Sequence, residues 1–194
     1  CNNNSVEIIK STEVKKILTQ DNSVTGVQLN NGEIIESTCI ISNTDPKTTY
    51  LNLLGAEILD TDFIRRTKNF RNKGNVAKLE LVFENDINIK GVNNNMYGKF
   101  IYAPNIKYIE HAFNANKYNK YSENPCLEFY INKNTLSANV YYVPHLTNSN
   151  HQENEIIKKC ISVLSKFIPD MQISKEKLIT PNAMGVKYNV AGGH

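Results

Sequence analysis

The sequence predicts an α+β fold, in which a small β meander precedes a mixed or antiparallel sheet covered on one side by helices. Three observations lead to this prediction. Residues 6–41 alternate apolar and polar side chains between short turn signals, as strands do. A second group of alternating segments begins near residue 75. Apolar residues also recur at helical spacing, most clearly over residues 153–168.

The meander is predicted from short apolar segments separated by turn residues. Strands are expected within residues 6–9, 12–20, 23–36 and 38–42. The pair Asn31-Gly32 is typical of a type I′ hairpin turn, because both residue types tolerate positive φ. Asp21-Asn22 is expected to form the preceding turn.

Two short helices are expected next. In "DPKTTYLNLLG", Asp45 is placed to cap a helix, Pro46 to occupy its first position and Gly55 to end it. The segment "DTDFIRRTKNF" predicts a second helix, with Asp60 or Thr61 as its cap.

The second half of the chain predicts a sheet of about four or five strands with covering helices. Strands are expected within residues 76–84, 97–104, 126–132, 137–144 and 176–181. The first of these places alternate residues on one buried face, namely Ala77, Leu79, Leu81 and Phe83. Helix 105–118 would be capped by Asn105 and would carry Ile106, Ile109 and Phe113 along one side.

The amino-acid composition narrows the classes of protein to which the chain could belong. Of the 194 residues, 40% are hydrophobic, which is ordinary for a globular protein. A formal net charge of +3 gives no reason to expect nucleic acid as a partner. The four cysteines form no CxxC pair, which argues against a zinc site and fits a reducing cytoplasm. No apolar run reaches the length that crosses a bilayer.

Complete catalytic signatures are absent, including GxGxxG, the P-loop, GxSxG and HExxH. The four histidines have no metal-ligand spacing. His111 is expected to lie partly exposed on a helix, and His145 to lie in a loop at a strand end. Cys160 falls in an apolar helical stripe, so it is expected in the core rather than as a nucleophile.

Two features allow both a structural and a functional interpretation. Tyrosines on the predicted strands fit sheet packing, or they line an apolar ligand cavity. They are Tyr97, Tyr102, Tyr130, Tyr141 and Tyr142. The corner "SNTDP" fits an ordinary helix cap, or its backbone amides face a phosphate or a ring system.

The order of the motifs is more informative than any one of them. The chain runs from "EIIKSTEVKKILTQ" through "GVQLNNGEII" and "CIISNTDPKTTYLNLLG" to "FIRRTKNFRNKGNVAKLELVF" and "LITPNAMGVKYNVAGGH". In this order it resembles the middle of phytoene desaturase-like FAD-dependent oxidoreductases. Within that family it is most similar to the pyridine nucleotide-disulfide oxidoreductase domain-containing protein 2 branch. The chain departs from those relatives over "INKNTLSANVYYVP", where they have a longer loop that contains proline.

The resemblance implies a flavoprotein whose dinucleotide-binding fingerprint lies outside this chain. Residue 1 is Cys rather than Met, and the last residues are Gly-Gly-His, so we expect a fragment of a longer protein. Residues 1–47 would be a β meander of the FAD-binding domain, and residues 48–194 would form the substrate-binding domain. The fragment alone is expected to be inactive and to hold FAD poorly, because the pyrophosphate-binding part is missing.

The resemblance also implies positions for the cofactor and the substrate. The strand around Val14 would approach the adenine end of FAD, while Ser42, Asn43 and Thr44 would close over the flavin cleft. The second sheet would wall a cavity for an apolar small molecule. The candidates for that wall are Tyr102, Tyr130 and Tyr142. No metal is implied, and no residue stands out as a general base.

Several functions remain open from the sequence. The flavin would oxidise an apolar substrate by desaturation, isomerisation or amine oxidation. The partners would be that substrate and the remaining parts of the longer chain, in the cytoplasm. The alternative is a non-enzymatic module that uses the same sheet to bind a lipid or a protein. Peripheral membrane contact is a weaker alternative, because no basic amphipathic helix supports it.

Overall fold

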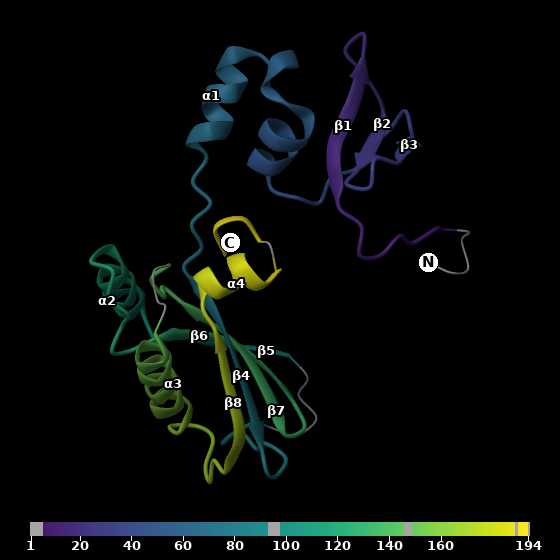
Figure 1. The fold of residues 1–194 in the computed structure, drawn as a ribbon. Coiled ribbons are helices and arrows are strands. Elements are labelled where there is room, and N and C mark those ends of the chain that lie inside the picture. Colours follow the sequence, from purple (N-terminus) through teal and green to yellow (C-terminus); the bar gives the residue numbers. More distant parts are fainter. Residues whose placement is uncertain (1–5, 93–97, 146–148, 189, 194) are drawn as a thin grey trace. The chain divides into compact units, whose positions relative to one another are not determined.

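A computed structural model describes the chain except for residues 1–5, 93–97, 146–148, 189 and 194. The chain forms two compact units, here called unit 1 (residues 1–71) and unit 2 (residues 72–194). Each combines strands with helices, which confirms the α+β prediction (Figure 1). Helices 47–54 and 61–69 group with the meander in this division, and the assignment of residues 1–47 to a FAD-binding domain and 48–194 to a substrate-binding domain stays a prediction.

Unit 1 begins with an antiparallel sheet in the order β1-β2-β3. Its strands are β1 (Val14–Gln20), β2 (Ser23–Leu29) and β3 (Ile34–Glu36). The strands expected at residues 6–9 and 38–42 are not formed, so that part of the prediction is wrong. A strand needs a hydrogen-bonded neighbour, and these two segments have none in the described sheet. Most of their apolar side chains stay exposed, with Ile41 at 94%, while Ile40 is half-buried.

The type I′ geometry predicted for Asn31-Gly32 is found instead at Asp21-Asn22. Asp21 and Asn22 have φ of 49° and 61°, the left-handed pair that this turn requires. At the other turn only Gly32 has positive φ, at 89°. The Asn31 side-chain oxygen accepts the Glu33 amide there at 3.0 Å, which holds Asn31 in an ordinary conformation.

Three helical segments complete unit 1. They are the π-helix η2 (Lys47–Leu54), the 3₁₀-helix η3 (Ala56–Ile58) and α1 (Thr61–Asn69). The Asp45 carboxylate accepts the amides of the first turn of η2, as its position in the sequence predicts. Asp60 caps α1 by accepting the amides of Asp62 and Phe63 at 2.8 and 3.2 Å.

Unit 2 is built on a five-stranded antiparallel sheet in the order β5-β6-β7-β4-β8. The strands are β4 (Val76–Phe83), β5 (Lys99–Tyr102), β6 (Cys126–Asn132), β7 (Thr135–Tyr141) and β8 (Ile173–Ile179). These five were all predicted, with boundaries that shift by a few residues. Tyr97, expected in the second of them, lies outside the described residues.

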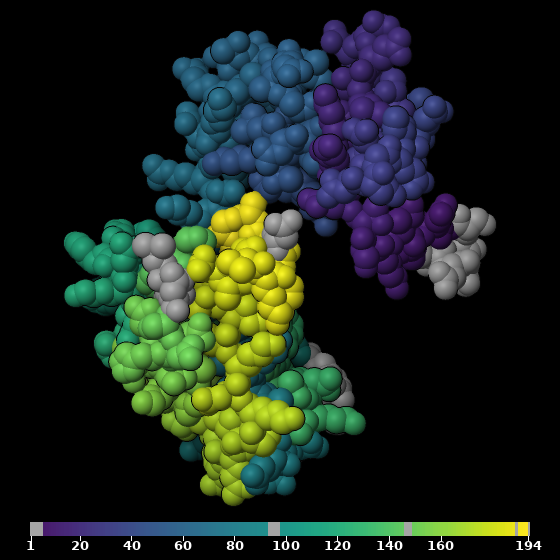
Figure 2. Space-filling model, in the orientation of Figure 1, coloured from purple at the N-terminus to yellow at the C-terminus, as the bar shows by residue number. Residues whose placement is uncertain are grey.

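The helices of unit 2 are α2 (Ile106–Lys117), α3 (Asn150–Leu164), α4 (Pro181–Tyr188) and the 3₁₀-helix η4 (Ala191–Gly193). Asn105 caps α2 as expected, and Ser149 caps α3. The sequence did not predict α4, which begins where the Thr180 hydroxyl accepts the Ala183 amide at 3.2 Å. Figure 2 shows α3 and β8 forming adjoining strips of the surface of unit 2.

One face of the five-stranded sheet forms the core with α3. The four residues predicted for the buried face of β4 are 0–4% exposed, and Cys160 and Leu164 of α3 are fully buried against them. The apolar side chains predicted along one side of α2 are not its buried contact. Ile106 is 75% and Phe113 41% exposed, while Ala112 is buried, so α2 packs through a smaller side chain.

Two glycines near the end of unit 2 allow its last segment to pack closely against its first. Gly192 and Gly193 have φ of 65° and 67°, and the Gly192 carbonyl accepts the Gly74 amide at 2.8 Å. A Cβ atom on Gly193 would overlap the Pro181 carbonyl, and one on Gly192 would overlap that of Asn72. Only glycine fits this close backbone approach. No helix in the described part of the chain is long and apolar enough to span a membrane.

Candidate functional site

An open groove of about 690 Å³ lies entirely within unit 1. Its size falls in the range of small-molecule sites, roughly 300–1,000 Å³. Apolar side chains form most of the wall: Ile17, Val24, Ile40, Tyr50, Leu54, Ile58 and Leu59. The polar side chains on it are Thr19, Asn22, Ser42, Thr44 and Thr49. The groove therefore joins an apolar wall to a short row of uncharged polar groups.

Strand alternation and helical spacing place these side chains. Ile17 and Thr19 lie two residues apart on β1, so they share one face of the three-stranded sheet. Thr49 and Tyr50 lie in η2, whose wide turns bring the Thr49 hydroxyl back to the corner that precedes the helix. The corner residue Ile40 completes the wall.

Three hydroxyl groups gather at the polar end of the groove. The Ser42 Oγ lies 3.0 Å from the Thr44 Oγ1 and 2.8 Å from the Thr49 Oγ1. The Thr44 and Thr49 oxygens lie 2.7 Å apart, which closes a triangle of hydrogen bonds. The triangle links the corner to η2 and fixes the direction of each hydroxyl group.

The Asp45 carboxylate accepts hydrogen bonds from the backbone amides at the start of η2. One carboxylate oxygen accepts the amides of Lys47 at 2.9 Å and Thr48 at 3.2 Å. Partial burial favours the protonated acid, but hydrogen bonds from Thr48 and Lys47 outweigh it and hold the pKa of Asp45 below its usual value. The corner therefore carries a fixed negative charge where free amides would attract an anion.

The structure brings together two of the four residues that the resemblance assigned to FAD. Ser42 and Thr44 line the groove, and Asn43 is exposed but is not part of its lining. Val14 lies at the start of β1, where it pairs with Leu29 and is half-buried, also outside the lining. Their contacts with a cofactor remain a prediction.

The three candidate tyrosines of unit 2 do not share one surface. Tyr102 lies on the helix-covered face, 5.5 Å from the Phe167 ring between centroids. Tyr130 lies on the opposite, open face and is 45% exposed. Tyr142 follows β7 with φ of 65°, and its ring lies 5.4 Å from that of Phe113. The contact of each of these tyrosines with a substrate stays a prediction.

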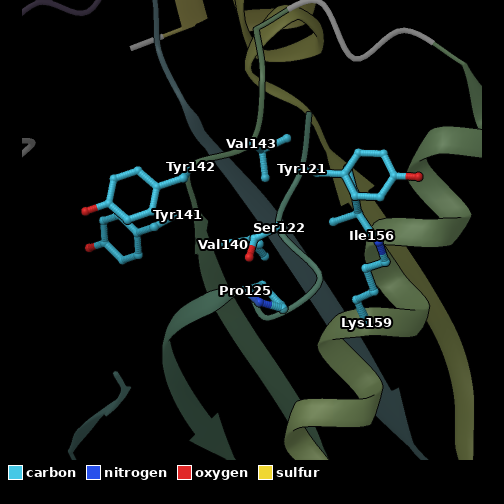
Figure 3. A pocket seen from close by; sticks show the side chains of 9 residues that line it. All are labelled: Tyr121, Ser122, Pro125, Val140, Tyr141, Tyr142, Val143, Ile156 and Lys159. Carbon is cyan, nitrogen blue, oxygen red and sulfur yellow. The ribbon is translucent and has the colours of Figure 1, made fainter. Parts of the chain in front are cut away.

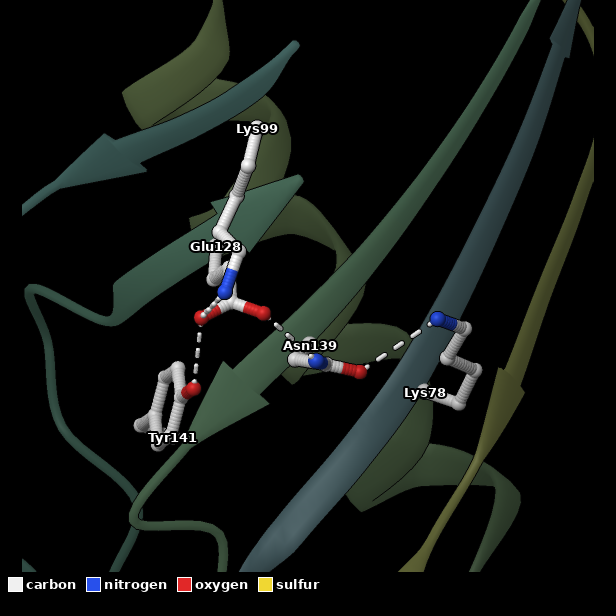
Figure 4. A network of polar contacts seen from close by, with 5 residues as sticks. All are labelled: Lys78, Lys99, Glu128, Asn139 and Tyr141. Atoms are coloured by element: carbon white, nitrogen blue, oxygen red, sulfur yellow. Dashed lines mark hydrogen bonds and ion pairs between the residues drawn. The ribbon is translucent and has the colours of Figure 1, made fainter. Parts of the chain in front are cut away.

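The open face of the five-stranded sheet carries a network that the sequence did not predict (Figure 4). The Glu128 carboxylate accepts the Tyr141 hydroxyl at 2.9 Å and the Asn139 amide at 3.1 Å. The Lys99 ammonium lies 3.3 Å from Glu128, and Lys78 donates to the Asn139 oxygen at 3.3 Å. The network joins β5, β6, β7 and β4 through one carboxylate.

The network sets the charge state of its members. The Tyr141 hydroxyl is the main cause that lowers the pKa of Glu128, and Lys99 and Asn139 add to it, while desolvation opposes them. Desolvation and the neighbouring Glu128 raise the pKa of Tyr141. Glu128 is thus an ionised carboxylate with three donors, suited to holding strands together and poorly suited to accepting a further proton.

A second cavity, in unit 2, is too small for a ligand. It measures about 10 Å³, room for one water molecule at most. Figure 3 shows Tyr142 and Tyr121 on opposite sides of it. The Lys159 ammonium lies at its rim, 2.6 Å from the Glu123 carboxylate.

Cys160, His111 and His145 lie in the places that the sequence predicted for them. Cys160 is fully buried, and burial raises the pKa of its thiol to about 12, which makes it inert. His111 is exposed on α2. His145 is half-buried beyond β7, and its Nδ1 has no hydrogen-bond partner among the described residues. No group of three potential metal ligands occurs in the described ranges.

Comparison with known proteins gives a coarse structural similarity. No protein-family model matches the chain. No curated protein matches it either. The structure is similar to part of an oxidoreductase from Methanosarcina mazei, with a TM-score of 0.43 and 12% sequence identity. The match covers 87% of this chain and 37% of that oxidoreductase.

Sequence reasoning missed two residues that organise these sites. Thr49 carried no signal, because a threonine in a short helix is usually a surface residue. Glu128 carried a weak sequence signal, since it is the single acidic residue within the apolar strand "CLEFYIN". A charged residue between buried neighbours on a strand indicates an outward face with a partner nearby.

Proposed function

We propose that this chain is part of a FAD-dependent oxidoreductase of the phytoene desaturase type and acts on an apolar substrate. One observation carries the proposal. Ser42 and Thr44, which the motif order assigns to the flavin cleft, lie on a groove of about 690 Å³ with an apolar wall.

The groove residues fit the uncharged part of a flavin. Its apolar side chains would exclude water from a flat ring, and the three hydroxyls would orient polar groups of the ligand. FAD, when bound, supplies the acceptor for hydride or electrons. The sequence contains no GxGxxG fingerprint, so the pyrophosphate would be held by residues outside this chain.

The proposal assigns unit 2 to the substrate. Tyr102 on the helix-covered face, Tyr130 on the open face and Tyr142 after β7 remain separate candidates for contact with the substrate. No residue is proposed as a general base, because Glu128 is held ionised by three donors and Tyr141 donates to it.

The test is the visible spectrum of the natural full-length protein that contains this chain. We expect a yellow protein that retains FAD through gel filtration. A Thr44→Val, Ser42→Ala double variant should lose much of the bound flavin, while Thr25→Val, an exposed change on β2, should retain it. A colourless protein that takes up no added FAD would overturn the proposal.

A binding module without catalysis is the second candidate. Two apolar side chains on the open face of the sheet favour it, since Ile101 is 68% and Tyr130 45% exposed. A lipid or a protein would cover them. The same spectrum separates the two candidates, because a binding module holds no flavin and is colourless.

A further inference from the structure

We propose that Asn31 is a site of spontaneous covalent modification, at which the side-chain amide is converted to a carboxylate and strand β3 is released from the sheet of unit 1. The site lies in the turn between β2 and β3, outside the groove. The reactants are the chain itself and water, so the inference goes beyond the proposed function and does not depend on it.

The reaction joins Asn31 to the residue that follows it. The Gly32 backbone nitrogen forms a bond to the Asn31 Cγ, the bond from Cγ to Nδ2 breaks, and ammonia leaves with the hydrogen of the Gly32 amide. Water then opens the five-membered imide at one of its two carbonyl carbons. The product is aspartate, or isoaspartate if the backbone now runs through the former side chain. The net change is hydrolysis of one amide, without any change of oxidation state.

Gly32 is the least hindered neighbour that an asparagine can have in this reaction. Asn31 is the one asparagine in the sequence that is followed by glycine. A side chain on the following residue would crowd the approach of its nitrogen to Cγ, and glycine has none. At Gly32 even the place of a missing Cβ is surrounded by open space. Both residues are exposed, so water reaches the imide.

The turn also polarises the carbonyl group that is attacked. The Glu33 amide donates to the Asn31 Oδ1 at 3.0 Å. Negative charge develops on this oxygen when the nitrogen adds to Cγ, so a donor placed here stabilises the intermediate as an oxyanion hole does. The Gly32 amide donates to the Leu29 carbonyl at 3.0 Å, and this bond must open before the attack. The reaction therefore requires one hydrogen bond to open at the tip of the hairpin.

The product replaces an attraction in the turn by a repulsion. The Asn31 Nδ2 now donates to the Glu33 carboxylate at 3.3 Å. After the reaction a second carboxylate stands beside that of Glu33, and neighbouring carboxylates repel each other. Glu13 adds negative charge next to them, because its carboxylate lies 2.7 Å from the Asn30 Nδ2.

Strand β3 is held weakly enough for this change to release it. It spans three residues at the edge of the described sheet and pairs there with β2 (Figure 1). The two strands approach so closely that a Cβ on Gly26 would overlap the Ile35 carbonyl. An isoaspartate adds a methylene to the backbone between these strands and so shifts the register that the close approach requires.

The experiment ages the 194-residue chain in mildly alkaline buffer and follows each asparagine by peptide mass spectrometry, with electron-transfer fragmentation to tell aspartate from isoaspartate. Asn30 is the internal control, because it is exposed in the same turn but is followed by asparagine. We expect conversion at Asn31 to be roughly tenfold faster or more, since the next residue has no side chain. Equal rates at Asn30 and Asn31, or an Asn31 that stays intact while a free peptide of residues 27–36 is converted, would overturn the site.

Hydrogen exchange tests the release of β3. The Ser37 amide donates to the Thr25 carbonyl at 3.1 Å across the β2–β3 pair, so its protection reports the pairing. We expect that protection to fall in step with conversion of Asn31. The Val143 amide of unit 2, bonded to the Asn75 carbonyl at 2.8 Å, should keep its protection. Unchanged protection of Ser37 in the converted chain would overturn the release of the strand.

Two variants separate the covalent change from general ageing. Asn31→Gln keeps a side-chain amide, but attack would close a less favourable six-membered ring, so Ser37 should stay protected through the same storage. Asn31→Asp carries the product charge from the start without the extra methylene, and should show part of the loss before storage. Loss of Ser37 protection in aged Asn31→Gln equal to that in the parent chain would contradict the inference. None of these measurements involves flavin, so this inference and the proposed function fail separately.

Discussion

The two units bury their apolar side chains in opposite ways. In unit 2 a whole sheet face packs against α3, and Leu79, Leu81 and Leu136 are fully buried. In the described part of unit 1, residues 6–71, the buried hydrophobic residues are Ile17 and Leu29, while other apolar side chains line an open groove. Unit 2 is thus built around a core, and unit 1 around a surface that a ligand would cover.

Because of this difference, truncating an apolar side chain should have different consequences in the two units. A packed core loses several kcal/mol when a side chain is truncated, because a cavity remains. An open wall loses little on truncation, but gains stability when a ligand fills it. The chain should therefore contain one part that resists change and one part whose stability depends on its ligand.

The largest effect should come from the core of unit 2. Leu79→Ala is expected to lower the free energy of unfolding of unit 2 by about 2–5 kcal/mol, since the side chain is fully buried on β4. Urea unfolding followed by circular dichroism measures this. Ile34→Ala in unit 1 removes a side chain that is 55% exposed and should stay within about 0.5 kcal/mol. Similar losses for both variants would remove the contrast between the units.

The next effect should come from the glycine closure of unit 2. Gly193→Ala adds a Cβ that overlaps the Pro181 carbonyl at positive φ, and should destabilise unit 2 by about 2–4 kcal/mol. Gly32→Ala is the matched change in unit 1, because Gly32 also has positive φ but nothing crowds its Cβ position. That variant should lose only about 1–2 kcal/mol. Equal decreases in the melting temperature of the two variants would show that the positive φ, rather than the crowded Cβ position, determines the loss of stability.

A smaller effect is expected at the cap of η2 in unit 1. Asp45→Ala leaves the Lys47 and Thr48 amides unpaired and should cost about 1 kcal/mol. Asp45→Asn keeps an acceptor and should be close to the parent protein. Hydrogen exchange of the η2 amides reports the change locally. Protection that is equally low in both variants would mean that the charge of Asp45, rather than its hydrogen bonds, stabilises the helix.

The smallest effect should appear only in acid. The pKa of Glu128 is lower in the folded protein than its ordinary value of 4.5, so its contribution is present above that pH. It is lost as the pH falls through the lowered pKa, when the carboxylate takes up a proton and releases Tyr141. Glu128→Gln should therefore flatten the loss of unit 2 stability below pH 4.5. If the substitution left the dependence of unit 2 stability on acid pH unchanged, other carboxylates would control that dependence.

Local sequence signals predicted most elements and failed where tertiary contacts decide. The alternation of "VAKLELVF" and the stripe of α3 follow directly from burial on one face. The extra strands at residues 6–9 and 38–42 were equally apolar but had no partner strand to pair with. Similarly, α4 begins at Pro181, directly after its cap Thr180, and its apolar residues are too few to show a period.

The candidate site was predictable only in part for the same reason. The corner at Ser42 and Thr44 stood out because a strand signal meets a helix cap within a few residues. Thr49 joins them through a π-helical turn, a geometry that no local pattern indicates. Tyr102 and Tyr130 lie on opposite faces of their sheet, and only the strand register reveals this.

The glycine closure has a consequence for how unit 2 could be handled. The Gly74 amide meets the Gly192 carbonyl, so the first and last segments of unit 2 lie side by side. A unit whose ends adjoin tolerates circular permutation. A short linker could join residues 193 and 72, and new ends could be opened at the tight turn Lys133-Asn134 between β6 and β7. The permuted sheet would keep every strand neighbour that it has now.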